Sequence, residues 1–233
     1  ENMAREGAAN LTLIAADHQT SGRGRKGRSW LSSPGQGLAF SLILIPQPDW
    51  KLEGPPGRFS GLGALAVARA VRKRYQLPAL IKWPNDVLIQ DKKVCGVLVE
   101  AHWKGDSLTD IILGMGVNVH PGSIPDRTHL QFPATSLARE LGSEVRRLPL
   151  LVDIVADLLE LYQLIFKQEF MNLWQDLLAY RGEWISLSEG GEEIDQGVLL
   201  GLSSWGGIRV KGGSAPERVY HGGEIRLRLV DRS

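Results

Sequence analysis

Residues 80–119 read LIKWPNDVLIQDKKVCGVLVEAHWKGDSLTDIILGMGVNV, a run of apolar segments of strand length. The segments are residues 80–83, 87–89, 94–103 and 109–119, and short polar turns such as Pro-Asn-Asp and Lys-Gly-Asp separate them. Apolar runs bounded by such turns are typical of strands, and the two longest runs predict a β-hairpin. The stretch therefore predicts a mainly antiparallel sheet.

The residues around this stretch add helices and more strands. Residues 11–16 predict a short strand, and residues 38–45 are almost continuously apolar, which predicts a strand buried on both faces. Apolar residues at helical spacing predict four amphipathic helices, at residues 59–75, 136–141, 150–166 and 170–180.

The pattern changes after residue 181. Short apolar runs at 184–187, 198–202, 208–210, 218–220 and 224–229 follow each other closely, and glycine-containing turns separate most of them, as in a small β-barrel. We therefore predict an α+β fold with two domains. A mixed, mainly antiparallel sheet with packed helices forms residues 1–181, and a small barrel forms residues 182–233.

The composition excludes several classes of protein. The chain has 233 residues, and 27 Lys plus Arg against 26 Asp plus Glu give a formal charge of +1, which disfavours a polybasic nucleic-acid binder. The single cysteine, Cys95, excludes a disulfide-stapled secreted scaffold. No run approaches the ~20 apolar residues of a membrane span, and Arg5 and Glu6 interrupt the start of the chain, unlike in a signal peptide. We predict a cytoplasmic protein that binds neither membrane nor nucleic acid.

The stretch GRGRKGRSW at residues 22–30, called the arginine loop below, carries the strongest chemical signal. Its glycines satisfy G-x-G-x-x-G, but Trp30 and Pro34-Gly35 follow where a dinucleotide-binding fingerprint needs a helix. It also lacks the Gly-Lys-Ser/Thr end of a Walker A loop. Three arginines and a lysine between glycines can surround an anion closely, whereas the plain alternative is a solvated basic loop.

Three other segments strengthen the anion-site interpretation, and four of their residues matter here. Lys82 ends a strand just before a rigid turn, where a lysine is usually an ordinary surface residue but where ligands also bind. Gly96 and Gly116 lie inside apolar strands, and a glycine there marks either the close approach of a ligand or backbone, or a bulge. Asn118 carries both donors and an acceptor, which suits it to a base edge or, alternatively, to capping a turn.

Together these segments resemble the biotin–protein ligase family (biotin–[acetyl-CoA-carboxylase] ligases). Residues 22–30, 82–86, 93–100 and 114–118 match, in order, the family's G-R-G-R-x-G-R-x-W, K-W-P-N-D, K-x-x-G-[IV]-L-x-E and G-x-G-[IV]-N motifs. The resemblance covers nearly the whole chain and implies a class II synthetase-like biotin ligase core with a small SH3-like C-terminal barrel. No helix-turn-helix segment is visible, so we expect no N-terminal DNA-binding domain in this chain.

The resemblance implies roles for individual residues. Arg25 and Lys82 would be catalytic. Contacts to biotin or its activated carboxylate are implied for Gln19, Arg23, Gly24, Arg25 and Lys82. The adenylate or ATP would be held by Arg28, Trp30, Asn118, Gly96 and Gly116, and Phe132 is our candidate for the aromatic residue that covers adenine.

One family feature is missing from the chain. The Ser/Thr-Thr-Asn element that holds the biotin ureido ring precedes the arginine loop in the family, and residues 3–9 resemble what normally follows it. Because the chain also begins at Glu1 and not at methionine, we expect it to be trimmed just past that element or its site to be incomplete.

The implied reaction joins biotin to a lysine of a biotin carboxyl carrier domain in two steps, through biotinyl-5'-AMP. ATP and biotin would be substrates, with Mg²⁺ accompanying ATP. Neither step needs a nucleophile from the enzyme, and we find no Ser–His–Asp or Cys–His set, no His ligand spacing and therefore no predicted metal site. Cys95 is read as a core residue, and a homodimer is a candidate assembly.

Two alternatives stay open at this point. A lipoate– or octanoate–protein ligase-like acyltransferase shares the general fold by resemblance, although the tryptophan-ended arginine loop argues against it. A non-enzymatic anion-binding module would also explain a basic loop joined to a barrel.

Overall fold

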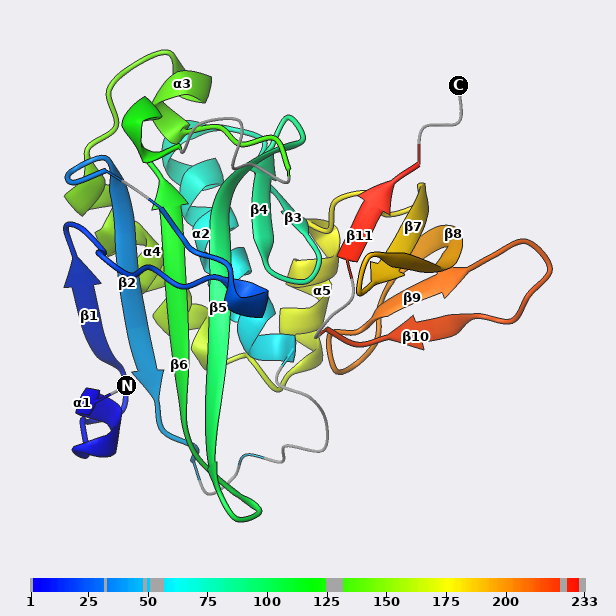
Figure 1. Ribbon diagram of the computed structural model, residues 1–233, viewed down its shortest axis with the longest axis horizontal. Helices are drawn as coiled ribbons and strands as arrows, with labels where there is room; N and C mark the ends of the chain where they lie inside the picture. Colours follow the sequence, from blue (N-terminus) through cyan, green and yellow to red (C-terminus); the bar gives the residue numbers. More distant parts are fainter. Residues whose placement is uncertain are drawn as a thin grey trace.

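The computed structural model describes residues 2–31, 33–47, 50, 57–124, 132–222 and 226–230. Its main feature is a six-stranded antiparallel sheet in the order β1-β2-β6-β5-β4-β3 (Figure 1). In chain order the strands are β1 Thr12–Ala16, β2 Gly37–Leu44, β3 Leu80–Lys82, β4 Asp86–Ile89, β5 Lys92–Lys104 and β6 Ser107–Asn118.

The long hairpin and the buried strand follow the prediction. β5 pairs with β6 so that Gly96 lies directly opposite Gly116. β2 lies between β1 and β6, and every residue of β2 except Ser41 is buried, which confirms a strand covered on both faces. These strands form because their apolar side chains are covered on both sides of the sheet.

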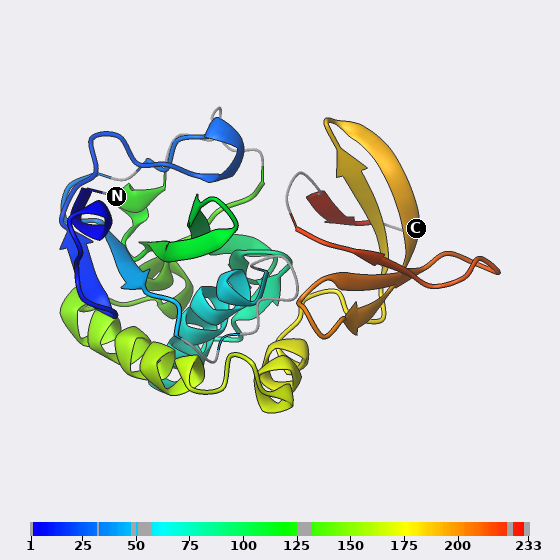
Figure 2. The ribbon, with the colours of Figure 1, turned by 90° about the horizontal axis from the view of Figure 1, so that it is seen from below.

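Two helices cover one face of the sheet, and the arginine loop crosses the opposite face (Figure 2). They are α2 Gly57–Tyr75 and α4 Arg147–Tyr162. The absence of a side chain at Gly63 lets α2 lie close to β5, since a Cβ there would come within 2.9 Å of Val97. The helices therefore seal the core side of the sheet and leave the other face for a site.

The smaller helices differ in places from the expected boundaries. The structure also contains α1 Asn2–Arg5, α3 Leu137–Leu141, η1 Arg25–Gly27 and η2 Pro121–Ser123. α4 begins three residues before the predicted start, because Pro149 fits the first helical turn without losing a hydrogen bond. Residues 125–131, part of the predicted loop 120–133, lie outside the described residues. No helix in the described part of the chain is long and apolar enough to cross a membrane.

The helix expected at residues 170–180 was wrong at its end. α5 spans Gln168–Asp176, and the chain then runs beside β3. Ile81 donates its backbone N–H to the Leu177 carbonyl at 2.7 Å and accepts from Ala179 at 2.9 Å. Backbone groups at the edge of a buried sheet need partners, so the segment after α5 pairs with β3 and does not continue the helix.

The C-terminal part is a second antiparallel sheet of five strands, in the order β10-β9-β8-β7-β11. The strands are β7 Trp184–Glu189, β8 Glu192–Leu202, β9 Ile208–Lys211, β10 Arg218–Tyr220 and β11 Arg226–Leu229. Among the described residues β10 and β11 are the two edges and the sheet is not closed, so the SH3-like barrel stays a prediction. The predicted boundary at 181/182 falls between α5 and β7.

The turn between β8 and β9 packs against the first sheet and its helices. Trp83 donates its indole N–H to the Gly206 carbonyl at 2.9 Å, and the Trp174 ring lies against Gly61 of α2 and Gly206. Buried Arg58 donates to the carbonyls of Ser204 and Ile165. The Lys-Trp-Pro-Asn-Asp segment is thus held in place by the C-terminal sheet.

Candidate active site

The arginine loop is a short hairpin closed at its base by backbone hydrogen bonds. Trp30 donates its N–H to the Gly22 carbonyl at 2.8 Å, and Gly24 donates to the Arg28 carbonyl at 2.6 Å. A Cβ on Gly22 would lie 2.3 Å from the Trp30 carbonyl oxygen, so a side chain at this position would prevent closure. The glycines therefore permit a compact loop.

Beneath the loop lies a cavity of about 650 Å³. Its walls come from the arginine loop, the turn before β4, and the faces of β2, β5 and β6 that point away from α2 and α4. Nine predicted site residues line it: Gln19, Arg23, Gly24, Arg25, Arg28, Trp30, Gly96, Gly116 and Asn118. A volume of this size suits a small-molecule substrate.

Ion pairs and hydrogen bonds connect the loop to the floor of the cavity. Arg23 Nη2 lies 2.9 Å from Glu100 Oε2, and Arg25 Nη1 donates to Asn85 Oδ1 at 3.0 Å. Asn85 is itself fixed, because its Nδ2 donates to the Val97 carbonyl at 2.6 Å. These contacts hold two guanidinium groups over the cavity.

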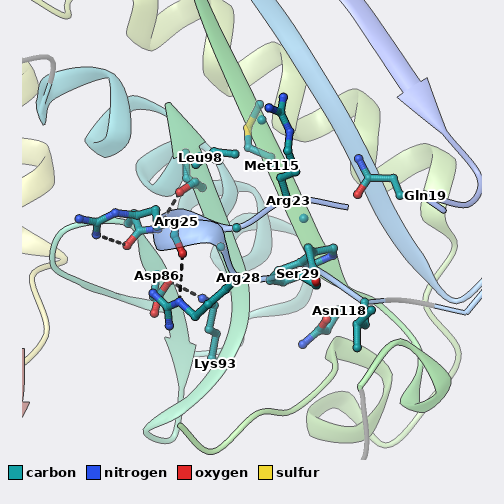
Figure 3. Close-up of a pocket in the computed structure, with 18 of the residues that line it drawn as sticks. Gln19, Arg23, Arg25, Arg28, Ser29, Asp86, Lys93, Leu98, Met115 and Asn118 are labelled. Carbon is teal, nitrogen blue, oxygen red and sulfur yellow. Dashed lines mark hydrogen bonds and ion pairs between the residues drawn. The ribbon is translucent and has the colours of Figure 1, made fainter. Parts of the chain in front are cut away.

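Positive charge is concentrated at one end of the cavity, where Arg25, Arg28 and Lys93 surround Asp86 (Figure 3). Lys93 Nζ lies 2.6 Å from Asp86 Oδ1 and forms an ion pair with it, but the angles of this contact do not meet those of a hydrogen bond. Burial lowers the pKa of the Arg25 guanidinium, an effect that Asp86 opposes and Arg28 reinforces. The charge on Arg25 is thus held in a place that would favour an added anion.

Lys82 approaches the cavity from behind Phe132. Its Nζ lies 3.9 Å from the centre of the Phe132 ring, and Phe132 lines the cavity, whereas Lys82 is not among the described lining residues. Burial lowers the pKa of the Lys82 ammonium; Asp86 opposes this change, and Lys93, Arg228 and Arg28 add to it. Access of Lys82 to a ligand thus depends on where the Phe132 ring lies.

Trp30 fills the floor at the two glycines that the sequence singled out. A Cβ on Gly116 would lie 2.3 Å from Trp30 Cε2, and a Cβ on Gly96 would lie 3.1 Å from Trp30 Cζ3. The sequence left open the approach of a ligand or backbone, or a bulge, whereas the group that lies against both glycines in this structure is the indole side chain of Trp30.

Asn118 and Gln19 lie away from this cationic end (Figure 3). Asn118 is 4% exposed and donates an Nδ2–H to the Thr135 carbonyl at 3.1 Å, which fixes the orientation of its amide. The amide carries one further N–H and an acceptor oxygen, the groups that pair with an adenine edge.

The lining residues that the sequence did not assign include four that carry a charge or an amide: Asn85, Asp86, Lys93 and Glu100. All four lie inside segments that we quoted as motifs, so the motif boundaries were the signal that could have found them. Cys95 is fully buried and burial raises the pKa of its thiol, in keeping with its role as a core residue. In the described ranges, no group of three or more His, Cys, Asp or Glu is arranged so that it could hold a metal ion.

Comparison with known proteins gives consistent matches. The model of the biotin/lipoate A/B protein ligase family matches residues 1–118. The bifunctional ligase/repressor BirA of Bacillus subtilis is 40% identical over 147 residues, 62% of this chain and 44% of that protein. BirA of Escherichia coli is 29% identical over 223 residues, 93% of this chain and 66% of that protein. This chain thus spans about half to two thirds of the length of these relatives.

Among solved structures, the biotin protein ligase from Aquifex aeolicus in complex with biotin and ATP superimposes with a TM-score of 0.82 at 33% identity. The match covers 98% of this chain and 94% of that one. Because the family model spans half of the sequence and this structure nearly all of it, the chain belongs to the biotin/lipoate A/B protein ligase family.

Proposed function

We propose that this chain attaches biotin to a lysine of a biotin carboxyl carrier domain in an ATP-dependent reaction. The observation that carries the proposal is the arginine loop folded over the cavity, with Arg23, Arg25 and Arg28 all lining it. The likeness to a ligase whose structure contains biotin and ATP supports the choice of substrates.

In the first step, an oxygen of the biotin carboxylate attacks the α-phosphorus of ATP, a new O–P bond forms and pyrophosphate leaves. Two anionic groups must approach each other, so fixed cations directed at the developing charge lower the barrier. Arg25 and Lys82 are proposed for this task, because both are held beside Asp86 in surroundings where burial lowers their pKa.

The predicted residues are assigned to two ends of the ligand. We assign the biotin end to Gln19, Arg23 and Gly24, together with Arg25 and Lys82. Arg28, Trp30 and Asn118 serve the adenylate end, with Gly96 and Gly116 beneath Trp30. Mg²⁺ would accompany ATP, because Asp86 and Glu100, the carboxylates among the described lining residues, each lie against a cation.

In the second step, the neutral amine of the carrier lysine attacks the acyl carbon of biotinyl-5'-AMP. An amide forms, AMP leaves and the amine loses a proton. A free lysine has a pKa of about 10.4 and is almost fully charged at neutral pH, so a cationic, partly buried site favours the neutral nucleophile. We propose the carrier domain as partner and the cytoplasm as location.

The experiment that tests the proposal measures biotin-dependent exchange of pyrophosphate into ATP, and then transfer of biotin to a purified carrier domain. We expect both activities with biotin and a much weaker exchange with lipoate or octanoate. Exchange that prefers lipoate would favour the other branch of the family. Ligand-dependent thermal stabilisation without any exchange would favour a binding module.

A further inference from the structure

The pair of glycines beneath Trp30 has a specific geometry. Gly96 of β5 and Gly116 of β6 are direct partners across the hairpin, and both line the cavity. The indole lies over both of them. A Cβ on Gly116 would come within 2.7 Å of both Trp30 Cζ2 and Nε1 as well as 2.3 Å from Cε2.

These distances leave no room for a methyl group. Carbon atoms pack best at about 3.5–4.0 Å, so an alanine at residue 116 would force the indole to move by more than about 1 Å. The backbone of β6 cannot retreat easily, because it is paired on both sides with β2 and β5. Trp30 would therefore be the group that moves.

Movement of Trp30 would be transmitted to the arginine loop. Trp30 is the last residue of the loop, and its N–H closes the hairpin on Gly22. Lys93 Nζ also lies 5.7 Å from the indole centre and 2.6 Å from Asp86. The indole thus connects the hairpin floor to both the loop and the cationic end of the cavity.

We propose that Gly96 and Gly116 are positioning residues that act through Trp30. Their missing side chains form a seat for the indole, and the seated indole holds the arginine loop over the cavity. This inference deepens the proposed function and rests on it for the catalytic consequence only. The alternative is that the two glycines make room for the ligand itself.

The main test compares Gly116→Ala with the unchanged protein in the absence of ligand. The seven tryptophans are labelled with 5-fluorotryptophan, and Trp30→Phe identifies the resonance of Trp30. We expect Gly116→Ala to shift that resonance and to reduce amide hydrogen-exchange protection in residues 22–30. An unchanged resonance with unchanged protection would overturn the proposal, whatever the activity of the protein.

A control variant and a milder seat variant accompany this test. Gly114→Ala lies two residues away on the same strand, where the nearest atom to an added Cβ is Ser41 Oγ at 3.6 Å, and it should leave the Trp30 resonance in place. Gly96→Ala creates a milder clash, 3.1 Å from Trp30 Cζ3 and 3.0 Å from Lys93 Nζ, and should give a smaller shift. An equal shift in all three variants would contradict the seat.

A double-variant comparison separates the seat from direct ligand contact. In the unchanged background, Gly116→Ala should lower kcat/KM for pyrophosphate exchange by about 100-fold, the cost of displacing catalytic groups by about 1 Å. Added to Trp30→Ala, the same substitution should cost little more, because no indole remains to be displaced. The same fold-loss in both backgrounds would show that the glycines contact the ligand and would refute the proposal.

Discussion

The cations around the cavity outnumber the carboxylates beside them, whereas the cations between α2 and α4 are matched by carboxylates. The second group forms what we call the α2–α4 network, which contains Arg69, Lys73, Arg74, Asp153, Asp157 and Glu160. In that network cations and carboxylates are equal in number. The described cavity lining instead contains Arg23, Arg25, Arg28 and Lys93 with Asp86 and Glu100.

The pKa of cations in the α2–α4 network and of cations near the cavity shifts in opposite directions. A hydrogen bond to Asp153 raises the pKa of Arg74, so folding favours the charged form of that side chain. Burial lowers the pKa of Arg25 and of Lys82, so folding disfavours their charged forms. Charge in the α2–α4 network stabilises the fold, whereas charge at the cavity costs stability that an anionic ligand would return.

Substitution of Arg25 should give the largest effect. Arg25→Ala should slow biotin-dependent pyrophosphate exchange by about 10²–10³-fold, the usual cost of removing a group that stabilises developing charge. The melting temperature of the ligand-free protein should stay the same or rise, because a buried charge is removed. Arg74→Ala, in the α2–α4 network, is the matched control and should exchange pyrophosphate normally. Near-normal exchange in Arg25→Ala would show that Arg25, like the cations of the α2–α4 network, has no role in catalysis.

Substitution of Lys82 should lower the activity and raise the stability of the protein. Lys82→Met should lower exchange by about 100-fold and raise the free energy of unfolding at neutral pH. Because the pKa of Lys82 is lower in the folded state, the unfolded chain binds more protons at pH values between the two pKa values. Stability of the unchanged protein should therefore rise with pH in that window.

Denaturant unfolding measured between pH 7 and 10.5 would test this sign. The contribution of Lys82 to the rise should be absent in Lys82→Met, and the two stability curves should converge at the alkaline end. A Met variant that is less stable than the unchanged protein throughout would mean that the Lys82 charge is compensated as fully as the charges of the α2–α4 network.

Much of the fold could be predicted because local patterns and tertiary contacts agree. The hairpin of β5 and β6 has apolar runs joined by a Lys-Gly-Asp turn, and each run is a strand in the structure. The segment after α5 could not be predicted in this way. Residues 177–179 pair with β3, and only the folded sheet shows that β3 has an edge to be covered.

The arginine loop could be singled out as a candidate anion site from residue types alone, whereas Lys93 could not. Along a regular strand Lys93 would share a face with buried Cys95. The pairing of β4 with β5 shifts at this point, since Val87 lies opposite Cys95 and Leu88 opposite Lys93. A bulge of this kind turns a side chain to the other face, and here it directs Lys93 to the cavity.

The sequence singled out the two strand glycines, but it did not show which group lies against them. The sequence left open a ligand, another backbone or a bulge at Gly96 and Gly116, and the structure places the Trp30 indole there. The contact joins residues far apart in the chain, so the pattern within either strand cannot reveal it. For the same reason the position of Lys82 behind Phe132 could not be predicted.

A change at the centre of the α2–α4 network should affect stability and leave activity intact. Asp157 is 4% exposed and lies 2.5 Å from Lys73 and 3.2 Å from Arg69. Asp157→Asn should lower the free energy of unfolding by about 1–3 kcal/mol, because the cations lose their buried partner. Urea unfolding measures this loss. Pyrophosphate exchange at a temperature where both proteins are folded should be equal, and a loss of exchange would show that the two regions are coupled.

The smallest effect is expected at the exposed edge of the same network. Arg74 donates to Asp153 and thereby lowers the pKa of that carboxyl, so the pair stabilises the fold above the pKa of an unfolded aspartate, about 3.9. Its contribution is lost as pH falls through the lower folded value. The stability curves of the unchanged protein and Arg74→Ala should therefore differ slightly at pH 6 and converge as the pH falls below the folded pKa of Asp153.

High salt should reduce the same difference, because exposed ion pairs are screened over about 3 Å at 1 M ionic strength. Urea unfolding of both proteins at low and high salt would measure this. A difference that persists at pH 2 or in 1 M NaCl would mean that Arg74 stabilises the helix pair by packing of its aliphatic stem. In that case apolar packing, and not charge, would stabilise the exposed edge of the α2–α4 network. The charge balance that distinguishes this network from the cavity would then depend on Asp157 and its two cations.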